Sequence, residues 1–125
     1  MSRPKSPVLT DGELRLMRVL WDRGDSSVNE AIETLRDRPK PAYNTVLTMF
    51  RILERKHYVR HRRVGRAFVF TAILNQTHAR RRAVRHLVSR FFNDSPSLLA
   101  LNLLDEEELS QEELTRLKQR IEDGP

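Results

Sequence analysis

The residues best suited to a chemical task lie between positions 43 and 51. Asn44, Thr48 and Arg51 recur at helical spacing, with Thr45 beside them and Tyr43 before them. Asn can form two hydrogen bonds with adenine, the Thr methyl group can touch the thymine methyl group, and Arg can bind guanine or phosphate. This pattern predicts a helix face that contacts base edges and phosphates. An ordinary solvated helix face is the alternative.

A second group of basic residues follows in the stretch VRHRRVGRAFVF, residues 59–70. Two β-rich runs, Tyr58–Arg63 and Arg66–Thr71, flank Val64-Gly65, which indicates a hairpin. Because Val64-Gly65 is not the favoured Asn-Gly turn, a longer loop is an alternative. The hairpin would offer a phosphate backbone four cationic side chains: Arg60, Arg62, Arg63 and Arg66.

The second half of this stretch, GRAFVF, also resembles an RNA-recognition strand on which bases stack. That strand carries a basic residue before its glycine and aromatic residues at its third and last positions. Here those places hold Val64, Arg66 and Thr71. The RNA-recognition fold also needs a strand well upstream, where this chain has helix signals. We therefore expect Phe68 and Phe70 to pack on helices from one face of the hairpin.

Capping boxes mark the helices that must position these side chains. The patterns Thr10–Glu13 and Ser27–Glu30 each open a helix. A third helix is predicted from about Ala42 to Lys56 by apolar residues at helical spacing. Three helices followed by a hairpin is the order of a winged helix-turn-helix domain, in which the third helix enters the major groove. We assign this domain to residues 8–73 within a mainly α fold that has one small β-hairpin.

Residues 74–125 are predicted to form a helical dimerisation domain. Ser95-Pro96 opens one short helix and the capping box Ser110–Glu113 opens another. These amphipathic helices have too little partner surface within one chain, so a second subunit is expected to cover them, with an intrachain helical subdomain as the alternative. The candidate interface residues are Leu87, Phe91, Leu98, Leu99, Leu101, Leu104 and Leu117.

Charge is distributed unevenly along the 125 residues. The formal net charge is +6, but residues 40–90 hold thirteen basic residues and one acidic residue, Glu54. This segment has the electrostatic character of a polyanion-binding surface. The chain has no cysteine, which excludes disulfides, zinc ribbons and thiol catalysis. Its four histidines lack metal-site spacing and no nucleophile has a base at a recognisable distance, so we expect no cofactor and no enzyme activity.

Four stretches together carry a family resemblance: LTDGELRLMRVLW, AYNTVLTMFRILERKHYV, GRAFVF and LLALNLLDEEELSQEELTRL. They resemble the penicillinase and methicillin-resistance repressors of the BlaI/MecI type, in register from about Leu9 to Ile121. The resemblance implies a homodimer that binds double-stranded, pseudo-palindromic operator DNA and represses resistance or cell-envelope genes. One departure is Lys56-His57, where the family has Lys-Gly, so the end of the third helix must be made without glycine.

The resemblance also implies how repression ends. A membrane metallopeptidase sensor, or its effector protease, triggers cleavage of such repressors between Asn and Phe, and the matching place here is Asn102-Leu103. No apolar run near 18 residues is present, so we expect no membrane insertion and a cytoplasmic protein. The alternative function is a protein-interaction adaptor on a winged-helix scaffold, whose basic surface meets an acidic partner.

Overall fold

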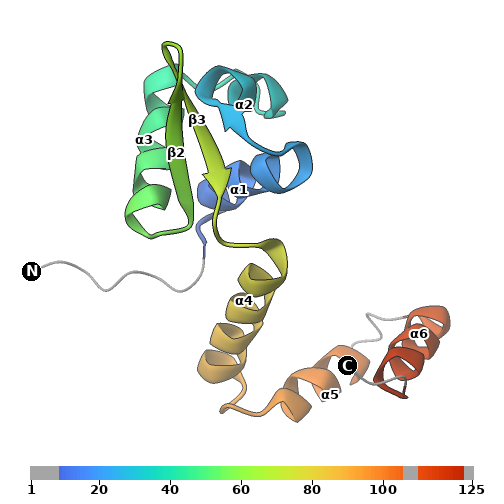
Figure 1. The fold of residues 1–125 in the computed structure, drawn as a ribbon. Helices are drawn as coiled ribbons and strands as arrows, with labels where there is room; N and C mark the ends of the chain where they lie inside the picture. Colours follow the sequence, from blue (N-terminus) through green and yellow to red (C-terminus); the bar gives the residue numbers. More distant parts are fainter. Residues whose placement is uncertain (1–8, 106–109, 123–125) are drawn as a thin grey trace, which may run out of the picture. The chain divides into compact units, whose positions relative to one another are not determined.

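A computed structural model describes residues 9–105 and 110–122 of the chain. Residue 8 of the first predicted domain, and residues 106–109 and 123–125 of the second, lie outside these ranges. The chain divides into two compact units, with the boundary between Val84 and Arg85. The elements, in order, are α1 (Asp11–Arg23), β1 (Ser26–Ser27), α2 (Val28–Thr34), α3 (Tyr43–Arg55), β2 (Val59–Val64), β3 (Ala67–Ala72), α4 (Gln76–Phe91), α5 (Pro96–Asp105) and α6 (Gln111–Glu122) (Figure 1).

The first two helices begin at the predicted capping boxes. The Thr10 hydroxyl accepts from the Glu13 backbone N–H at 3.2 Å, and the Glu13 carboxylate accepts from the Thr10 N–H at 2.8 Å. Ser27 and Glu30 repeat this arrangement at 3.1 and 2.9 Å. Each box satisfies two N–H groups that have no partner inside the helix. The prediction of both helix starts is therefore confirmed.

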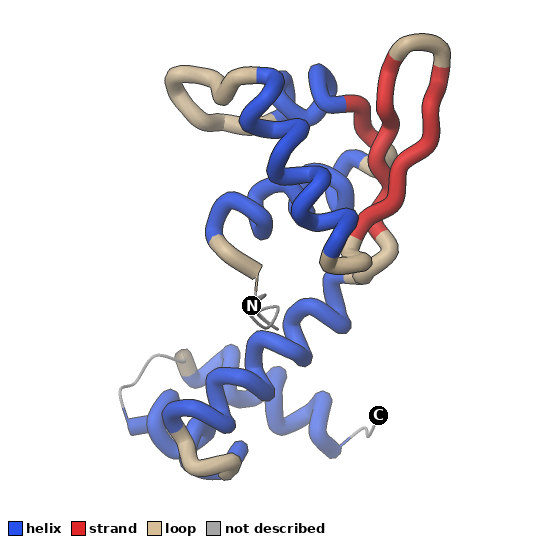
Figure 2. Tube along the Cα trace, turned by 90° about the vertical axis from the view of Figure 1, so that its left-hand side faces the viewer, coloured by secondary structure: helices blue, strands red, loops and turns tan. Residues whose placement is uncertain are grey.

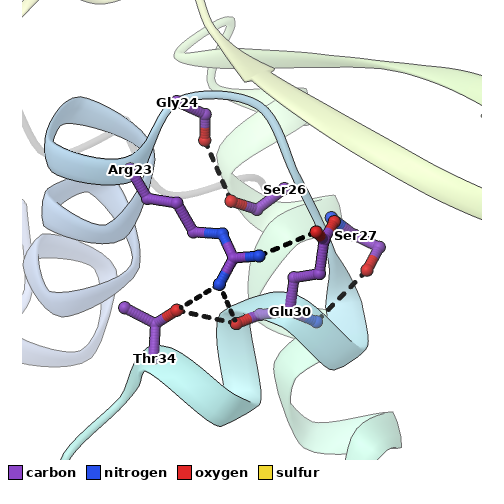
Figure 3. Close-up of polar contacts among 6 residues, drawn as sticks. All are labelled: Arg23, Gly24, Ser26, Ser27, Glu30 and Thr34. Carbon is purple, nitrogen blue, oxygen red and sulfur yellow. Dashed lines mark hydrogen bonds and ion pairs between the residues drawn. The ribbon is translucent and has the colours of Figure 1, made fainter.

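A hydrogen-bonded network joins the end of α1 to α2 (Figure 3). One Arg23 nitrogen donates to the Glu30 carboxylate at 2.7 Å, and the other donates to the Thr34 hydroxyl at 2.9 Å. The buried Ser26 hydroxyl donates to the Gly24 carbonyl at 2.9 Å in the connecting turn. The network fixes the direction of α2 before the chain enters α3.

The hairpin belongs to a three-stranded antiparallel sheet in the order β1-β3-β2. The third strand, β1, was not predicted; its two residues pair with Val69 and Phe70. Figure 2 shows β2 and β3 continuing past it to their turn. The expected turn at Val64-Gly65 is one residue out of place, since Val64 pairs with Ala67 and the turn is Gly65-Arg66. Gly65 has a φ of 61°, and glycine at the first of two turn residues favours the type II′ hairpin turn, so no longer loop is needed.

The core of the first unit lies between its helices and the inner face of the sheet. Phe50 of α3 stacks on Phe70 of β3, with ring centroids 4.3 Å apart and planes at 6°. Both rings are fully buried, and Phe68 packs at the edge of the same cluster. The predicted role of Phe68 and Phe70 as packing residues is confirmed. The sequence after the sheet is tied back to α1, because Trp21 Nε1 donates to the Leu74 carbonyl at 2.9 Å.

The end of α3 shows how the chain turns without the expected glycine. His57 adopts a φ of 65°, in the left-handed region. Its N–H donates to the Glu54 carbonyl and the Tyr58 N–H donates to the Leu53 carbonyl, both at 3.0 Å. These two bonds define a Schellman motif, accompanied by burial of Tyr58 and Leu53 in one cluster. The hairpin therefore starts in a fixed direction, but a residue with a β-carbon occupies a position that favours glycine.

The second unit has little core of its own. Ser95 and Pro96 begin α5 as predicted, with the Leu98 N–H donating to the Ser95 hydroxyl at 3.3 Å, and the capping box of Ser110 and Glu113 begins α6. Among its described residues, Val88 is the one buried hydrophobic side chain. No helix in residues 9–105 and 110–122 has the length and apolar character needed to cross a membrane.

Candidate DNA-binding surface

The polar face predicted for α3 is exposed along its length. Tyr43 is 42% exposed, and Asn44, Thr45, Thr48 and Arg51 are also exposed, whereas the opposite face of α3 is buried in the core. The residue before the helix, Ala42, provides no side-chain cap. The first N–H groups of α3 therefore remain available to an anion or a base edge.

The four hairpin arginines do not share one face. Residues opposite each other in an antiparallel pair lie on the same face of the sheet. Arg60 and Arg62 pair with Thr71 and Val69 on the outer face, while Arg63 pairs with Phe68 on the face that packs against the helices. These arginines are equivalent in the sequence, but the strand register separates them.

Arg62 is held within the protein on the outer face. Its guanidinium contacts the Asp25 carboxylate at 2.8 Å and the Thr71 hydroxyl at 3.3 Å. The hydrogen bond from Arg62 lowers the pKa of Asp25, and the charge of Arg60 adds to the effect. Arg62 therefore braces the hairpin against the turn after α1, in addition to any role toward a ligand.

Arg63 and Arg66 differ from Arg62 in their contacts. The Arg63 guanidinium lies 5.4 Å from the centre of the Phe68 ring, a cation–π contact that restricts the side chain. Arg66 is exposed in the turn and, in the part of the chain that the structure describes, forms no ion pair. Arg66 and Tyr43 also line a hollow between the hairpin turn and the starts of α2 and α3.

The same hollow includes Asn29, which the sequence analysis missed. Asn29 is exposed in the first turn of α2, two residues after the cap Ser27. Its side chain can donate to a phosphate or a base. The available signal was a polar residue inside the capping box Ser27–Glu30, directly after the apolar Val28 and in the exposed first turn of the helix.

A buried ion pair positions α3 on α1. Lys56 Nζ lies 2.6 Å from a Glu13 carboxylate oxygen, and the two side chains are 15% and 6% exposed. Burial acts to raise the pKa of Glu13, but hydrogen bonds from Lys56 and the Thr10 N–H outweigh it and hold that pKa below its ordinary value. Glu13 therefore connects the capping box of α1 to the last turn of the candidate recognition helix.

The candidate dimerisation residues are mostly uncovered. Phe91 is 68% exposed, the largest exposed fraction among the large hydrophobic side chains that the structure describes, and Leu99 is half-buried. The other candidate dimerisation residues are all exposed: Leu87, Leu98, Leu101, Leu104 and Leu117. Asn102 and Leu103 lie on α5 and are exposed as well. Among the described residues, no three His, Asp or Glu side chains gather as a metal site.

Comparison with known proteins decides the family. The model of the family described as "Penicillinase repressor" matches residues 9–123. The chain belongs to the penicillinase repressor family. It is 30% identical over 119 residues to the penicillinase repressor of Bacillus licheniformis, covering 95% of this chain and 93% of that protein.

A relative that is more distant in sequence and a solved structure also match this chain. The methicillin resistance regulatory protein MecI of Staphylococcus aureus is 19% identical over 114 residues, covering 91% of this chain and 93% of that protein. The solution structure of the DNA-binding domain of the repressor BlaI aligns with a TM-score of 0.51 and 30% identity, covering 61% of this chain and 93% of that chain. The predicted family, its winged-helix fold and its character as DNA-binding repressors are thereby confirmed.

Proposed function

We propose that this protein is a homodimeric transcriptional repressor that reads operator DNA with α3 and contacts the flanking phosphates with the hairpin. The observation that carries the proposal is the exposed face of α3, where Asn44 and Thr48 stand opposite a fully buried apolar face. Side chains of these types, near the start of a recognition helix, suit base contacts in the major groove.

The charge of the segment that contains α3 and the hairpin supports DNA over an acidic protein as the partner. Residues 40–90 carry a net charge of +12, from thirteen basic residues and one acidic residue. Arg63 and Arg66 lie on the hairpin, where they suit contacts with phosphates on either side of the bases that α3 reads. An adaptor with an acidic partner would use the charge but would not need a polar, base-reading stripe on α3.

A second copy of the chain is the proposed cover for the second unit. Among the residues of the second unit whose burial the structure describes, Val88 is the one buried hydrophobic side chain, which is too little core for a unit that begins at Arg85 to be stable alone. Its exposed leucines and Phe91 offer an apolar surface that a second copy can bury symmetrically. Dimerisation would also place two winged-helix domains on two half-sites, as a pseudo-palindromic operator requires.

Release from DNA is proposed to follow cleavage at Asn102-Leu103, set off by a membrane metallopeptidase sensor or its effector protease. The bond lies within α5, so the protease would act after local unfolding of this helix. A cut there separates α6 from the rest of the chain and removes part of the proposed dimer surface. The regulated genes are expected to serve antibiotic resistance or the cell envelope. The repressor is expected to act in the cytoplasm.

Binding titrations at several salt concentrations test the proposal. The wild-type protein first selects a duplex from a random-sequence pool, and each variant is then titrated with this duplex and a scrambled one. Asn44→Ala should lose about 1–3 kcal/mol on the selected duplex and little on the scrambled one, because a base contact is lost. Arg66→Ala should weaken both duplexes and reduce the salt slope by about one unit for one phosphate contact.

The matched control is Glu33→Ala, which changes an exposed side chain on α2 outside the proposed contacts. Equal losses on both duplexes for Asn44→Ala would refute base reading by α3. A wild-type protein that shows no preference among duplexes would instead favour the adaptor.

A further inference from the structure

The one acidic residue of the basic segment 40–90 lies at the junction of α3 and the hairpin. Glu54 is in the last turn of α3, one turn beyond Arg51, and its side chain is 32% exposed. A carboxylate at the edge of a phosphate-binding surface repels the ligand. Its presence there calls for a role that outweighs this repulsion.

Glu54 makes two bonds to a single hairpin residue. Its Oε2 atom accepts from the His61 backbone N–H at 3.1 Å and lies 2.6 Å from His61 Nδ1. Because a carboxylate only accepts, the Nδ1 atom must carry the proton in this contact. The His61 ring also lies against Phe68 and Phe70, at centroid distances of 5.4 and 5.7 Å. Glu54 thus binds both the backbone and the side chain of His61 in β2.

The hairpin has few other supports near its turn. The short strand β1 pairs with Val69 and Phe70 only, so no strand in the described residues lies beside β3, on the side away from β2, between these residues and the turn. The outer face is braced at Arg62 by Asp25, and the inner face is braced at the preceding residue, His61, by Glu54. The carboxylates of Glu54 and Asp25 therefore bind consecutive residues of β2 from opposite faces of the sheet.

We propose that Glu54 is a positioning residue for DNA recognition: by holding His61, it sets the angle of the hairpin on α3, so that Arg63 and Arg66 meet the phosphates beside the bases that α3 reads. The inference rests on the proposed function and adds to it a residue that touches no DNA. Arg63 is two residues beyond His61 on the same face, so a change of angle at His61 moves its guanidinium relative to α3.

The sign of the effect separates this role from simple electrostatics. If Glu54 acted only through its charge, Glu54→Ala and Glu54→Gln would both bind every duplex more tightly. If it acts by position, the two variants differ, because the Gln amide oxygen can still accept from the His61 N–H and the Ala methyl group cannot. We expect Glu54→Gln to bind the selected duplex at least as tightly as the wild type, and Glu54→Ala to bind it roughly fivefold more weakly, the factor for one lost hydrogen bond.

A double-mutant cycle tests whether the effect runs through the hairpin. Fluorescence anisotropy would measure binding of the full chain to the selected and scrambled duplexes, for Glu54→Ala in the wild type and in the Arg63→Ala/Arg66→Ala background. The loss should largely disappear in that background. The variant His61→Ala loses the Nδ1 bond but keeps the backbone N–H bond to Glu54, so it should show a smaller loss. Combining it with Glu54→Ala should lower affinity no further than Glu54→Ala alone. If Glu54→Ala alone fails to fold, His61→Ala in the wild type and in the Arg63→Ala/Arg66→Ala background provides the same test.

Several outcomes would overturn the proposal. They are binding by Glu54→Ala as tight as by Glu54→Gln, an undiminished loss without the two arginines, and recovery of affinity in the His61→Ala/Glu54→Ala double variant. If the wild type itself does not prefer the selected duplex, the proposed function fails and this inference falls with it. A wild type with clear preference and a Glu54→Ala variant with no loss would remove the role of Glu54 alone.

Discussion

Replacement of His57 by glycine should stabilise the protein, although it removes an entire side chain. His57 ends α3 at a φ of 65°, where a residue with a β-carbon is strained by roughly 1–2 kcal/mol relative to glycine. Relief of this strain stabilises the folded state, but about 0.5–1 kcal/mol of the effect is offset because glycine has greater conformational freedom in the unfolded chain. The His57 ring is exposed, and none of the hydrogen bonds described for the chain uses it. The expected net change in the free energy of unfolding is therefore a gain of about 0.5–1 kcal/mol.

Urea unfolding of the full chain, followed by the fluorescence of Trp21, measures this change. Trp21 is the single tryptophan and is bonded to the Leu74 carbonyl, so it reports on the first unit. Thermal unfolding followed by the same fluorescence should show a midpoint temperature higher by about 2–8 °C, given roughly 4–8 °C per kcal/mol for a domain of this size. In urea the signal should keep one cooperative transition with an unchanged slope and a higher midpoint concentration.

Two control variants isolate the backbone as the cause. His57→Ala removes the ring but keeps a β-carbon, so its stability should stay within about 0.5 kcal/mol of the wild type. Gly65→Ala should lose about 1 kcal/mol, because Gly65 has a φ of 61° and open space around it, so only backbone strain is added. A stabilising His57→Ala, or a destabilising His57→Gly, would show that the ring and not the backbone governs this helix end.

Three further predictions concern acid stability, assembly and release. The folded-state pKa of Glu13 is below its ordinary value of 4.5, so the stability contributed by its ionised carboxylate is complete above pH 4.5 and is lost as the pH falls through the folded pKa. Glu13→Gln should lower the free energy of unfolding by about 2–3 kcal/mol at neutral pH and should reduce the fall in stability at acid pH, as measured by urea titrations. An unchanged fall at acid pH would exclude the Glu13–Lys56 pair as its source. Leu98→Asp places a charge in the proposed dimer surface and should shift the protein toward monomer in sedimentation, with loss of affinity for a two-half-site duplex; a wild type that is monomeric at micromolar concentration would contradict the dimer. Incubation with the cognate sensor protease should yield a fragment that begins at Leu103, and an intact chain during full derepression would point to another route of release.

Local sequence signals predicted the helices well, because a helix start depends on neighbours within one turn. Thr10 with Glu13, and Ser27 with Glu30, form their capping boxes where the sequence places them. The buried face of α3 followed from residue spacing for the same reason, since the 3.6-residue period alone decides which side chains share a face. The basic segment 40–90 could likewise be recognised from the sequence, because counting charges along the chain requires no structure.

Contacts between distant residues could not be predicted in the same way. Glu13 and Lys56 are 43 positions apart, and Arg62 and Asp25 are 37 apart, so no local pattern connects them. The sequence therefore could not show that Arg62 is braced internally while Arg66 is not. The strand β1 was missed because two serines carry no strand signal until β3 provides a partner. The turn was displaced by one residue because both Val64-Gly65 and Gly65-Arg66 satisfy a rule based on one glycine.

The strand order β1-β3-β2 leaves β2 at the border of the sheet, with its outer row of N–H and C=O groups unpaired by any strand in the described residues. Such a border is a template on which the same strand of another molecule can add and start aggregation. Four successive residues of β2, Arg60 to Arg63, are arginine or histidine, and like charges facing each other oppose that addition. The arginines proposed to approach DNA would therefore also keep the protein dispersed while it is free. Loss of solubility is the consequence to expect if all of them were neutralised to weaken DNA binding.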